Sequence, residues 1–356
     1  DAVEHLAYQH SLVLERIQHL HGLVAAIERA MEDKKMGTTP TPAERFAAVT
    51  GVHKRIAREL AGTLESTSFA GLGDPHLGKV RDSYVQDGVR TIVTTDRVSA
   101  FDRLLGTIPF KGQALNAVAN YWFEATRDII PNHLLDVPDP NVVRVRECAP
   151  VALEFVVRGY ITGVTRTSLW FNYEEGRREV AGNALPEGLR KNERLASPIL
   201  TPTTKFEEHD RNISRGEAIG EGLVGDDLFD RAAAASLELF ERGTQLAAER
   251  GLMLVDTKYE FGLDAKGRIT LADEIHTPDS SRYWIAESCA ARIAAGREPE
   301  SLDKEFLRLW ISARCDPYKE PIPKIPAETL IEFSGKYVKL YERVTGRAFE
   351  KPDMKQ

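Results

Sequence analysis

Three charged residues of alternating sign directly follow an apolar run in the last third of the chain. Asp256, Lys258 and Glu260 come after the apolar residues 252–255. Side chains two positions apart in a β-strand lie on one face, so a strand here presents all three charges together. Such a row is costly to remove from water unless the charges pair or bind a ligand. The row therefore predicts either a solvated salt-bridge ladder or a binding site.

The residues that follow predict a β-hairpin that adds another acid to this face. A turn-type sequence, Asp264–Gly267, separates the first strand from a second strand-like segment. If Leu263 pairs with Arg268, then Lys258 faces Asp273. A slip of one residue would turn Asp273 to the opposite face. In the predicted register the acids around the lysine suit Mg²⁺ together with a phosphate.

The totals of the chain limit its partners and its setting. The 356 residues leave room for two or three domains, and the net charge of −7 at pH 7 argues against a nucleic-acid partner. We find no apolar run long enough to span a bilayer, so we expect no membrane partner. Cys148, Cys289 and Cys315 show no metal-ligand spacing. These features predict a cytoplasmic protein in a reducing environment.

The first 65 residues predict a helical extension. Apolar residues, with His10 at one position, recur at alternating spacings of four and three from Leu6 to Met31, which indicates a coiled-coil seam or one arm of a helical hairpin. A second helix is expected to start at Thr41–Glu44, with a threonine cap and a proline in the first turn, and to end near Leu64. The extension therefore predicts a homodimer or an intramolecular hairpin.

The remainder predicts an α+β fold with two lobes. A small sheet-rich lobe is expected over 70–157, and a larger α+β lobe with a helical tail over 158–356. In the small lobe the predicted strands are 78–85, 89–94, 142–146 and 151–157, with a helix over 116–130. In the larger lobe the predicted helices are 226–250, 282–295, 303–313 and 326–345.

Four further segments carry groups that suit anions. Lys79 and Arg81 alternate beside Gly78, where a phosphate can approach the backbone. Arg158 ends an apolar strand, and the loops 201–210 and 277–282 combine hydroxyls with basic and acidic residues, with Arg282 expected to open a helix. Each segment alone is also compatible with a plain exposed loop or a capping arginine. Together they predict a site for several anions.

Six motifs occur in order over residues 70 to 347, and on them the chain resembles the SAICAR synthetase family. The motifs are Gly78–Asp82, Thr95–Asp102, Val157–Gly163, Leu200–Lys205, Val255–Gly262 and Asp273–Arg282. The resemblance implies a two-lobed fold with an antiparallel-sheet ATP lobe. It also implies ATP-dependent joining of L-aspartate to the ribotide CAIR, giving SAICAR, ADP and phosphate in purine (IMP) biosynthesis. ATP and Mg²⁺ are the implied cofactors, and CAIR and L-aspartate are the implied small-molecule partners.

The resemblance also implies a role for each matching residue. The residues implied in catalysis are Lys258, Arg158, Asp256 and Lys205. Those implied in binding ATP are Gly78, Lys79, Arg81, Arg146 and Glu147. Those implied in binding the other substrates are Ser99, Asp102, Arg158, Asp210, Asp279, Ser281 and Arg282. Those implied in binding Mg²⁺ are Glu260 and Asp273.

The chain departs from the family pattern at two places. Many members have serine where this chain has Val164, so a contact with CAIR is lost or moves to Thr165 or Ser168. Residues 1–65 lie outside the pattern and resemble the coiled-coil region of MerR-type regulators. Two other functions are considered: a kinase-like phosphotransferase that uses the same hairpin, and a non-enzymatic coiled-coil regulatory module whose synthetase body has decayed.

Overall fold

The computed structural model describes residues 51–69, 71–207 and 209–349. The chain divides into two compact units, 1–61 and 62–356. In the first unit, residues 51–58 are helical. The predicted second helix therefore ends about six residues earlier than expected. The predicted coiled-coil seam lies outside the described residues.

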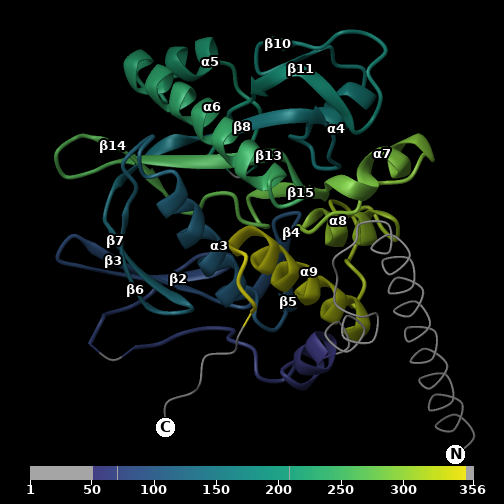
Figure 1. Ribbon diagram of the computed structural model, residues 1–356. Helices are drawn as coiled ribbons and strands as arrows, with labels where there is room; N and C mark the ends of the chain where they lie inside the picture. The colour runs from purple at the N-terminus through teal and green to yellow at the C-terminus, as the bar shows by residue number, and fades with distance from the viewer. Residues whose placement is uncertain (1–50, 70, 208, 350–356) are drawn as a thin grey trace, which may run out of the picture. The chain divides into compact units, whose positions relative to one another are not determined.

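The smaller sheet of the second unit is antiparallel and has the strand order β1-β2-β3-β7-β6 (Figure 1). Its strands are β1 (His76–Leu77), β2 (Arg81–Gln86), β3 (Val89–Thr94), β6 (Leu134–Asp139) and β7 (Val142–Arg146). A two-residue turn, Asp87–Gly88, joins β2 to β3 with positive φ at both positions, as the tightest hairpins require. A separate two-stranded sheet consists of β4 (Arg97–Ala100) and β5 (Arg103–Thr107).

Helix α3 (Lys111–Ala125) both begins and ends five residues earlier than the predicted helix over 116–130. Gly112 in its first turn argues against a helix on propensity alone. In the structure a Cβ at Gly112 would lie 2.2 Å from the carbonyl oxygen of Thr94. The close approach of α3 to β3 therefore requires this glycine.

The larger sheet contains β8 (Ala149–Ile161) and β13 (Leu252–Leu263) at its centre, in the order β11-β8-β13-β14. The predicted boundary between the lobes, after residue 157, falls within β8. The other strands of this sheet are β11 (Glu193–Leu200), β12 (Thr203–Thr204), β14 (Ile269–Ala272) and β15 (Ser281–Ile285). The long amphipathic helix α6 (Asp226–Ala248) covers β8 and β13 (Figure 1). Its Phe229 packs against Phe155, with ring centroids 5.3 Å apart.

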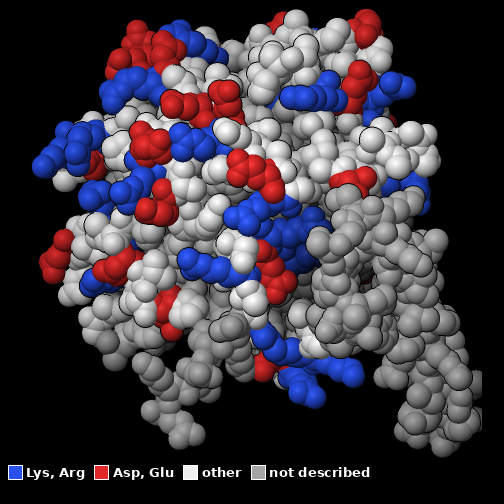
Figure 2. Space-filling view, viewed as in Figure 1, with Lys and Arg blue, Asp and Glu red and all other residues white. Residues whose placement is uncertain are grey.

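The remaining elements complete the larger lobe. They are α4 (Leu169–Glu174), β9 (Glu179–Val180), β10 (Asn183–Ala184), α5 (Arg215–Gly220), α7 (Ala286–Ala294), α8 (Glu305–Ser312) and α9 (Ala327–Thr345). Helix α9 packs against α3 of the smaller lobe (Figure 1). Among the described helices, none has the length and hydropathy to cross a membrane. On the face shown in Figure 2, acidic and basic side chains of the described residues are interspersed.

The predicted register of the charged hairpin is wrong by one residue. Leu263 pairs with Ile269 rather than with Arg268. The reason is the turn, where one oxygen of Asp264 accepts hydrogen bonds from the backbone N–H groups of Lys266 and Arg268, each 2.9 Å long. Arg268 therefore lies opposite Asp264, whose backbone N–H donates a 3.0 Å hydrogen bond to the Arg268 carbonyl, and the ladder begins at Leu263 and Ile269.

The predicted helix 282–295 is also wrong at its start. Residues Ser281–Ile285 form β15, and the helix begins only at Ala286. Aromatic side chains at Tyr283 and Trp284 are fully buried and favour the strand. Arg282 therefore stands on a strand beside β13 and does not open a helix.

Candidate active site

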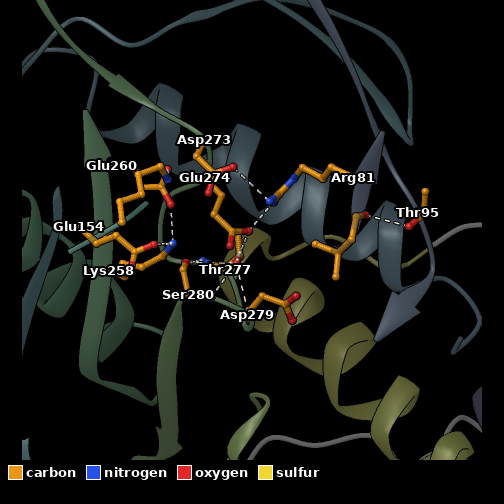
Figure 3. A network of polar contacts seen from close by, with 12 residues as sticks. Arg81, Thr95, Glu154, Lys258, Glu260, Asp273, Glu274, Thr277, Asp279 and Ser280 are labelled. Carbon is orange, nitrogen blue, oxygen red and sulfur yellow. Dashed lines mark hydrogen bonds and ion pairs between the residues drawn. The ribbon is translucent and has the colours of Figure 1, made fainter. Parts of the chain in front are cut away.

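Within the charged row of β13, Lys258 and Glu260 belong to one ion-pair network, while Lys258 and Asp256 face a cavity. Lys258 donates hydrogen bonds to Glu154 (2.7 Å) and to Glu260 (2.5 Å) (Figure 3). Lys205 donates to the other oxygen of Glu260. Glu154 comes from β8, directly opposite Glu260 in the ladder. Lys258 and Asp256 line the cavity. The row is thus both a salt-bridge network and the wall of a pocket.

Lys258 and Glu260 stay ionised despite their burial. Burial alone would lower the pKa of Lys258, but Glu260 and Glu154 raise it well above its usual value. Burial would raise the pKa of Glu260, but Lys258 and Lys205 hold it well below its usual value. Lys258 therefore presents a full positive charge to whatever enters the cavity.

A second cluster joins the smaller lobe to this row. Arg81 lies 3.3 Å from Asp273 and donates a 2.5 Å hydrogen bond to Glu274 (Figure 3). Burial and the nearby charge of Glu260 raise the pKa of Asp273 to about 6. Asp273 lies beyond the end of β14 in a left-handed conformation with φ of 60°. This turn of the backbone, and not the predicted strand register, brings Asp273 toward Glu260.

Three strands place an acid between two arginines in the deeper part of the cavity. Asp256 of β13 pairs in the ladders with Arg158 of β8 and with Arg282 of β15. Its carboxylate lies 2.6 Å from Arg282 and 3.4 Å from Arg158. Burial lowers the pKa of Arg158 to about 10, and the charge of Arg282 adds to this effect. With Glu305 as a second acid and Arg308 as a third arginine, this network keeps more arginines than paired acids, which suits an anion.

Arg282 continues this network to helix α8. It lies 3.1 Å from Glu305, which in turn lies 3.2 Å from Arg308. The Nε atoms of Arg282 and Arg308 are buried without a hydrogen-bond partner among the described residues. Arg308 lines the cavity with Arg158 and Arg282.

The cavity brings together many of the residues that the sequence indicated. Those that line it are Arg158, Asp210, Asp256, Lys258, Asp279, Ser281 and Arg282, with Thr165 and Ser168. Burial and the charges of Glu154 and Asp102 raise the pKa of Asp210 to about 6. Asp279 is held inside the protein by Lys111 (2.9 Å), Lys304 (3.1 Å) and the hydroxyl of Tyr337.

The residues that the sequence indicated for ATP lie at the start of β2 and at the end of β7 in the smaller sheet. Lys79 precedes β2, is exposed, and forms an ion pair with Asp102. Gly78 donates a 2.7 Å hydrogen bond to the carbonyl of Arg81. Arg146 ends β7, and Glu147 follows it just before the chain enters β8. Ser99 is buried on β4, in the same small hairpin as Asp102.

Two residues of the site escaped the sequence analysis. Glu154 on β8 and Arg308 on α8 both line the cavity. A lone acid inside an apolar strand was the available signal for Glu154. For Arg308 there was no signal, because an arginine on a short amphipathic helix is ordinary.

The fold and the site define a class of protein. A small antiparallel sheet that leads into a larger α+β lobe, with a cavity lined by buried ion pairs, is the arrangement of an enzyme that binds several anionic substrates. Comparison with known proteins identifies the family. The family model described as SAICAR synthetase matches residues 75–325.

Individual relatives agree with this match. A phosphoribosylaminoimidazole-succinocarboxamide synthase of Legionella pneumophila (strain Paris) is 52% identical over 278 residues, which cover 78% of this chain and 89% of that protein. A chloroplastic enzyme of the same name from Arabidopsis thaliana is 51% identical over 296 residues, covering 82% of this chain and 72% of that protein.

Solved structures agree as well. The SAICAR synthase of Saccharomyces cerevisiae in complex with SAICAR has a TM-score of 0.68 at 33% identity, covering 81% of this chain and 100% of that chain. A SAICAR synthetase in complex with ADP has a TM-score of 0.61 at 25% identity, covering 78% and 100%. The chain belongs to the SAICAR synthetase family. Its reaction is the ATP-dependent joining of L-aspartate to CAIR in purine biosynthesis.

Proposed function

We propose that Lys258 lies at the reacting carboxylate of CAIR and stabilises the negative charge that develops there. The supporting observation is its place between Glu154 and Glu260 on the wall of the cavity, at hydrogen-bonding distance from both. A buried cation that needs no reorganisation stabilises a charged transition state more than one in water does.

The proposed chemistry has two steps. An oxygen of the CAIR carboxylate bonds to the γ-phosphorus of ATP, while the bond from that phosphorus to ADP breaks. The amine nitrogen of L-aspartate then bonds to the activated carbonyl carbon, phosphate leaves with the bonding electrons, and the nitrogen loses a proton. Neither step needs a covalent bond to the protein, and both need three anionic substrates held in fixed positions.

We assign the ATP phosphates to Gly78, Lys79 and Arg81, and the adenine to the backbone around Arg146 and Glu147. In support, Arg81 reaches from the smaller sheet to the acids beside the β13 row. Lys79 is exposed and has only Asp102 as its ion-pair partner among the described residues.

We assign Mg²⁺ to Glu260 and Asp273. The raised pKa of Asp273, caused by burial and by Glu260, indicates two carboxylates whose mutual repulsion a divalent cation would relieve. Within the described residues, no group of three or more acidic, histidine or cysteine side chains is arranged to hold a metal. Two carboxylates with phosphate oxygens and water fit the way Mg²⁺ binds beside nucleotides. When bound, the ion would neutralise charge on the phosphates.

We assign CAIR to the deeper pocket of Arg158, Arg282 and Arg308, with Asp256 holding the first two guanidinium groups in place and Ser281 beside them. Thr165 and Ser168 line the same pocket and are 2.6 Å apart. We propose that these hydroxyls supply the contact with CAIR that the resemblance implies for a serine at position 164.

We assign L-aspartate to the region between the lobes near Lys205, Asp210, Ser99 and Asp102. In support, Asp210 lies in the cavity wall, and the charge of Asp102 acts on its pKa. Homodimerisation through residues 1–65 and a cytoplasmic location remain predictions. Light scattering on the full chain and on one lacking 1–65 tests the first.

ADP formation tests the proposed role of Lys258. We expect ADP release to need both CAIR and L-aspartate, and Lys258→Ala to lower kcat by roughly 10²- to 10³-fold, because a preorganised cation is lost. Lys266→Ala is the matched control, since Lys266 is exposed at the hairpin turn. A Lys258→Ala enzyme with unchanged kcat would refute the role, and ADP release without either substrate would refute the reaction.

A further inference from the structure

A short turn after α8 contacts both lobes beside the cavity. Residues 316–320 form a self-supported turn, in which the carboxylate of Asp316 accepts a 3.0 Å hydrogen bond from the N–H of Tyr318. The carbonyl of Asp316 accepts a 2.9 Å bond from the N–H of Glu320. The turn therefore holds the Tyr318 ring in a defined position.

On one side, Tyr318 contacts the turn between β4 and β5. The ring centroids of Phe101 and Tyr318 are 5.5 Å apart and nearly perpendicular. Phe101 and Asp102 both have left-handed backbones, with φ of 52° and 59°. Two consecutive residues in this conformation persist only where the surroundings hold them. Beside the ring contact, Arg103 donates a 2.6 Å hydrogen bond to the carbonyl of Glu320.

On the other side, Tyr318 contacts the loop that follows β8. The guanidinium of Arg166 stacks on its ring at 4.1 Å, and the backbone N–H of Arg166 lies 3.4 Å from its hydroxyl. The neighbours of Arg166 in the chain, Thr165 and Thr167, both line the cavity. A single ring therefore touches the β4–β5 turn and a cavity-lining loop.

The β4–β5 turn itself borders the site. Asp102 forms the ion pair with Lys79 that lies on the proposed ATP side. The charge of Asp102 also acts on Asp210, which lines the cavity. Whatever orients this turn therefore orients groups on both the nucleotide side and the substrate side.

We propose that Tyr318 is a positioning residue that fixes the β4–β5 turn to the loop 163–168 and so aligns the ATP and CAIR sites. It touches no reacting atom. Its effect passes through the backbone of Phe101 and Asp102 on one side and of Arg166 on the other. The inference rests on the proposed function for its kinetic consequence, but its structural consequence stands independently.

Kinetics and amide hydrogen exchange on the full chain test this role. Tyr318→Ala should lower kcat/KM for CAIR on the order of tenfold, because an aromatic contact and a cation–π contact are lost together. Exchange of residues 99–103 should quicken. Tyr318→Phe keeps the ring, so it should stay within about twofold of the unsubstituted chain, since the lost 3.4 Å contact is weak.

Arg314→Ala is the matched control, since Arg314 stacks on Trp310 at the same 4.1 Å. It should change neither readout, whereas Arg166→Ala should lower kcat/KM for CAIR. Unchanged kcat/KM and unchanged exchange in Tyr318→Ala would overturn the proposal. A fall in activity accompanied by an equal loss of thermal stability and no faster exchange at 99–103 would also overturn it. If the unsubstituted chain joins no aspartate to CAIR, the proposed function fails, and the exchange comparison still decides the role of Tyr318.

Discussion

At the scale of the residue, the site depends on charges that are buried but never isolated. Lys258 has two carboxylates, Glu260 has two lysines, and Asp256 has two arginines. Lys258 and Glu260 stay ionised because their partners offset the loss of water. Asp273 differs, because burial and Glu260 raise its pKa to about 6. At neutral pH, Asp273 therefore lowers the stability of the folded protein, although it belongs to the proposed site.

Replacing Asp273 should stabilise the protein at neutral pH while impairing it. A carboxyl group whose pKa rises on folding adds stability below its unfolded pKa near 4, and that stability is lost as pH rises through about 6. Asp273→Asn avoids this loss. We compare the unfolding free energy of this variant with that of the parent at each pH. We expect the difference, variant minus parent, to be about 1–2 kcal/mol larger at pH 7.5 than at pH 4.

Urea unfolding at the two pH values measures this difference. The same variant should lose activity and should no longer gain thermal stability from Mg²⁺ with ATP, whereas the parent should gain it. A pH-independent difference in unfolding free energy between the two proteins would contradict the account of Asp273.

At the scale of the element, the strand pairings decide which charges meet. The shared face of Asp256, Lys258 and Glu260 could be predicted, because the period of a strand is local. The opposing residues could not, because the register of β8 on β13 depends on residues a hundred positions away. The hairpin register was missed because Asp264 binds two backbone N–H groups within its turn.

The loop after β8 offers a test at this scale. Gly163 has φ of +97°, and a Cβ there would lie 2.4 Å from the hydroxyl of Ser168 and 2.5 Å from the guanidinium of Arg282. Gly163→Ala should therefore destabilise the protein by about 2–4 kcal/mol, as strain and overpacking add. It should also weaken CAIR binding, because Arg282 must move.

Gly176→Ala separates the two causes. Gly176 has a similar φ of +88°, but nothing lies within 4 Å of its Cβ position. It should cost only about 1–2 kcal/mol from backbone strain and leave CAIR binding unchanged. Equal losses of stability and of binding in the two variants, by thermal unfolding and calorimetry, would argue against the close packing of the loop.

At the scale of the second unit, residues 62–356, a few side chains join the smaller sheet to the larger. Arg81 of β2 contacts Asp273 and Glu274, which follow β14. Tyr318 and helix α9 make further contacts between the lobes. The site lies beside these contacts. The same side chains therefore align the two sides of the site and stabilise the fold.

Arg81→Met should show how much this junction matters. It leaves Glu274 buried without its cation, so we expect a loss of about 3 kcal/mol in unfolding free energy and weaker ATP binding. Arg144→Met is a control in the same sheet, because Arg144 and Asp136 form an exposed pair that should contribute less than about 1 kcal/mol. Similar losses in both variants on chemical unfolding would refute a special role for Arg81.

The sequence by itself determined the local patterns of this protein. It predicted the shared face of the β13 row, the long amphipathic helix over 226–250, which the structure ends at Ala248, and the family motifs. Each follows from backbone geometry over a few residues or from an unbroken string of residue types. Only the tertiary structure decided that Glu154 faces Lys258, that Arg308 joins the pocket, and that Asp273 approaches Glu260 through a left-handed turn. These contacts depend on registers and packing between distant segments, which no local period encodes.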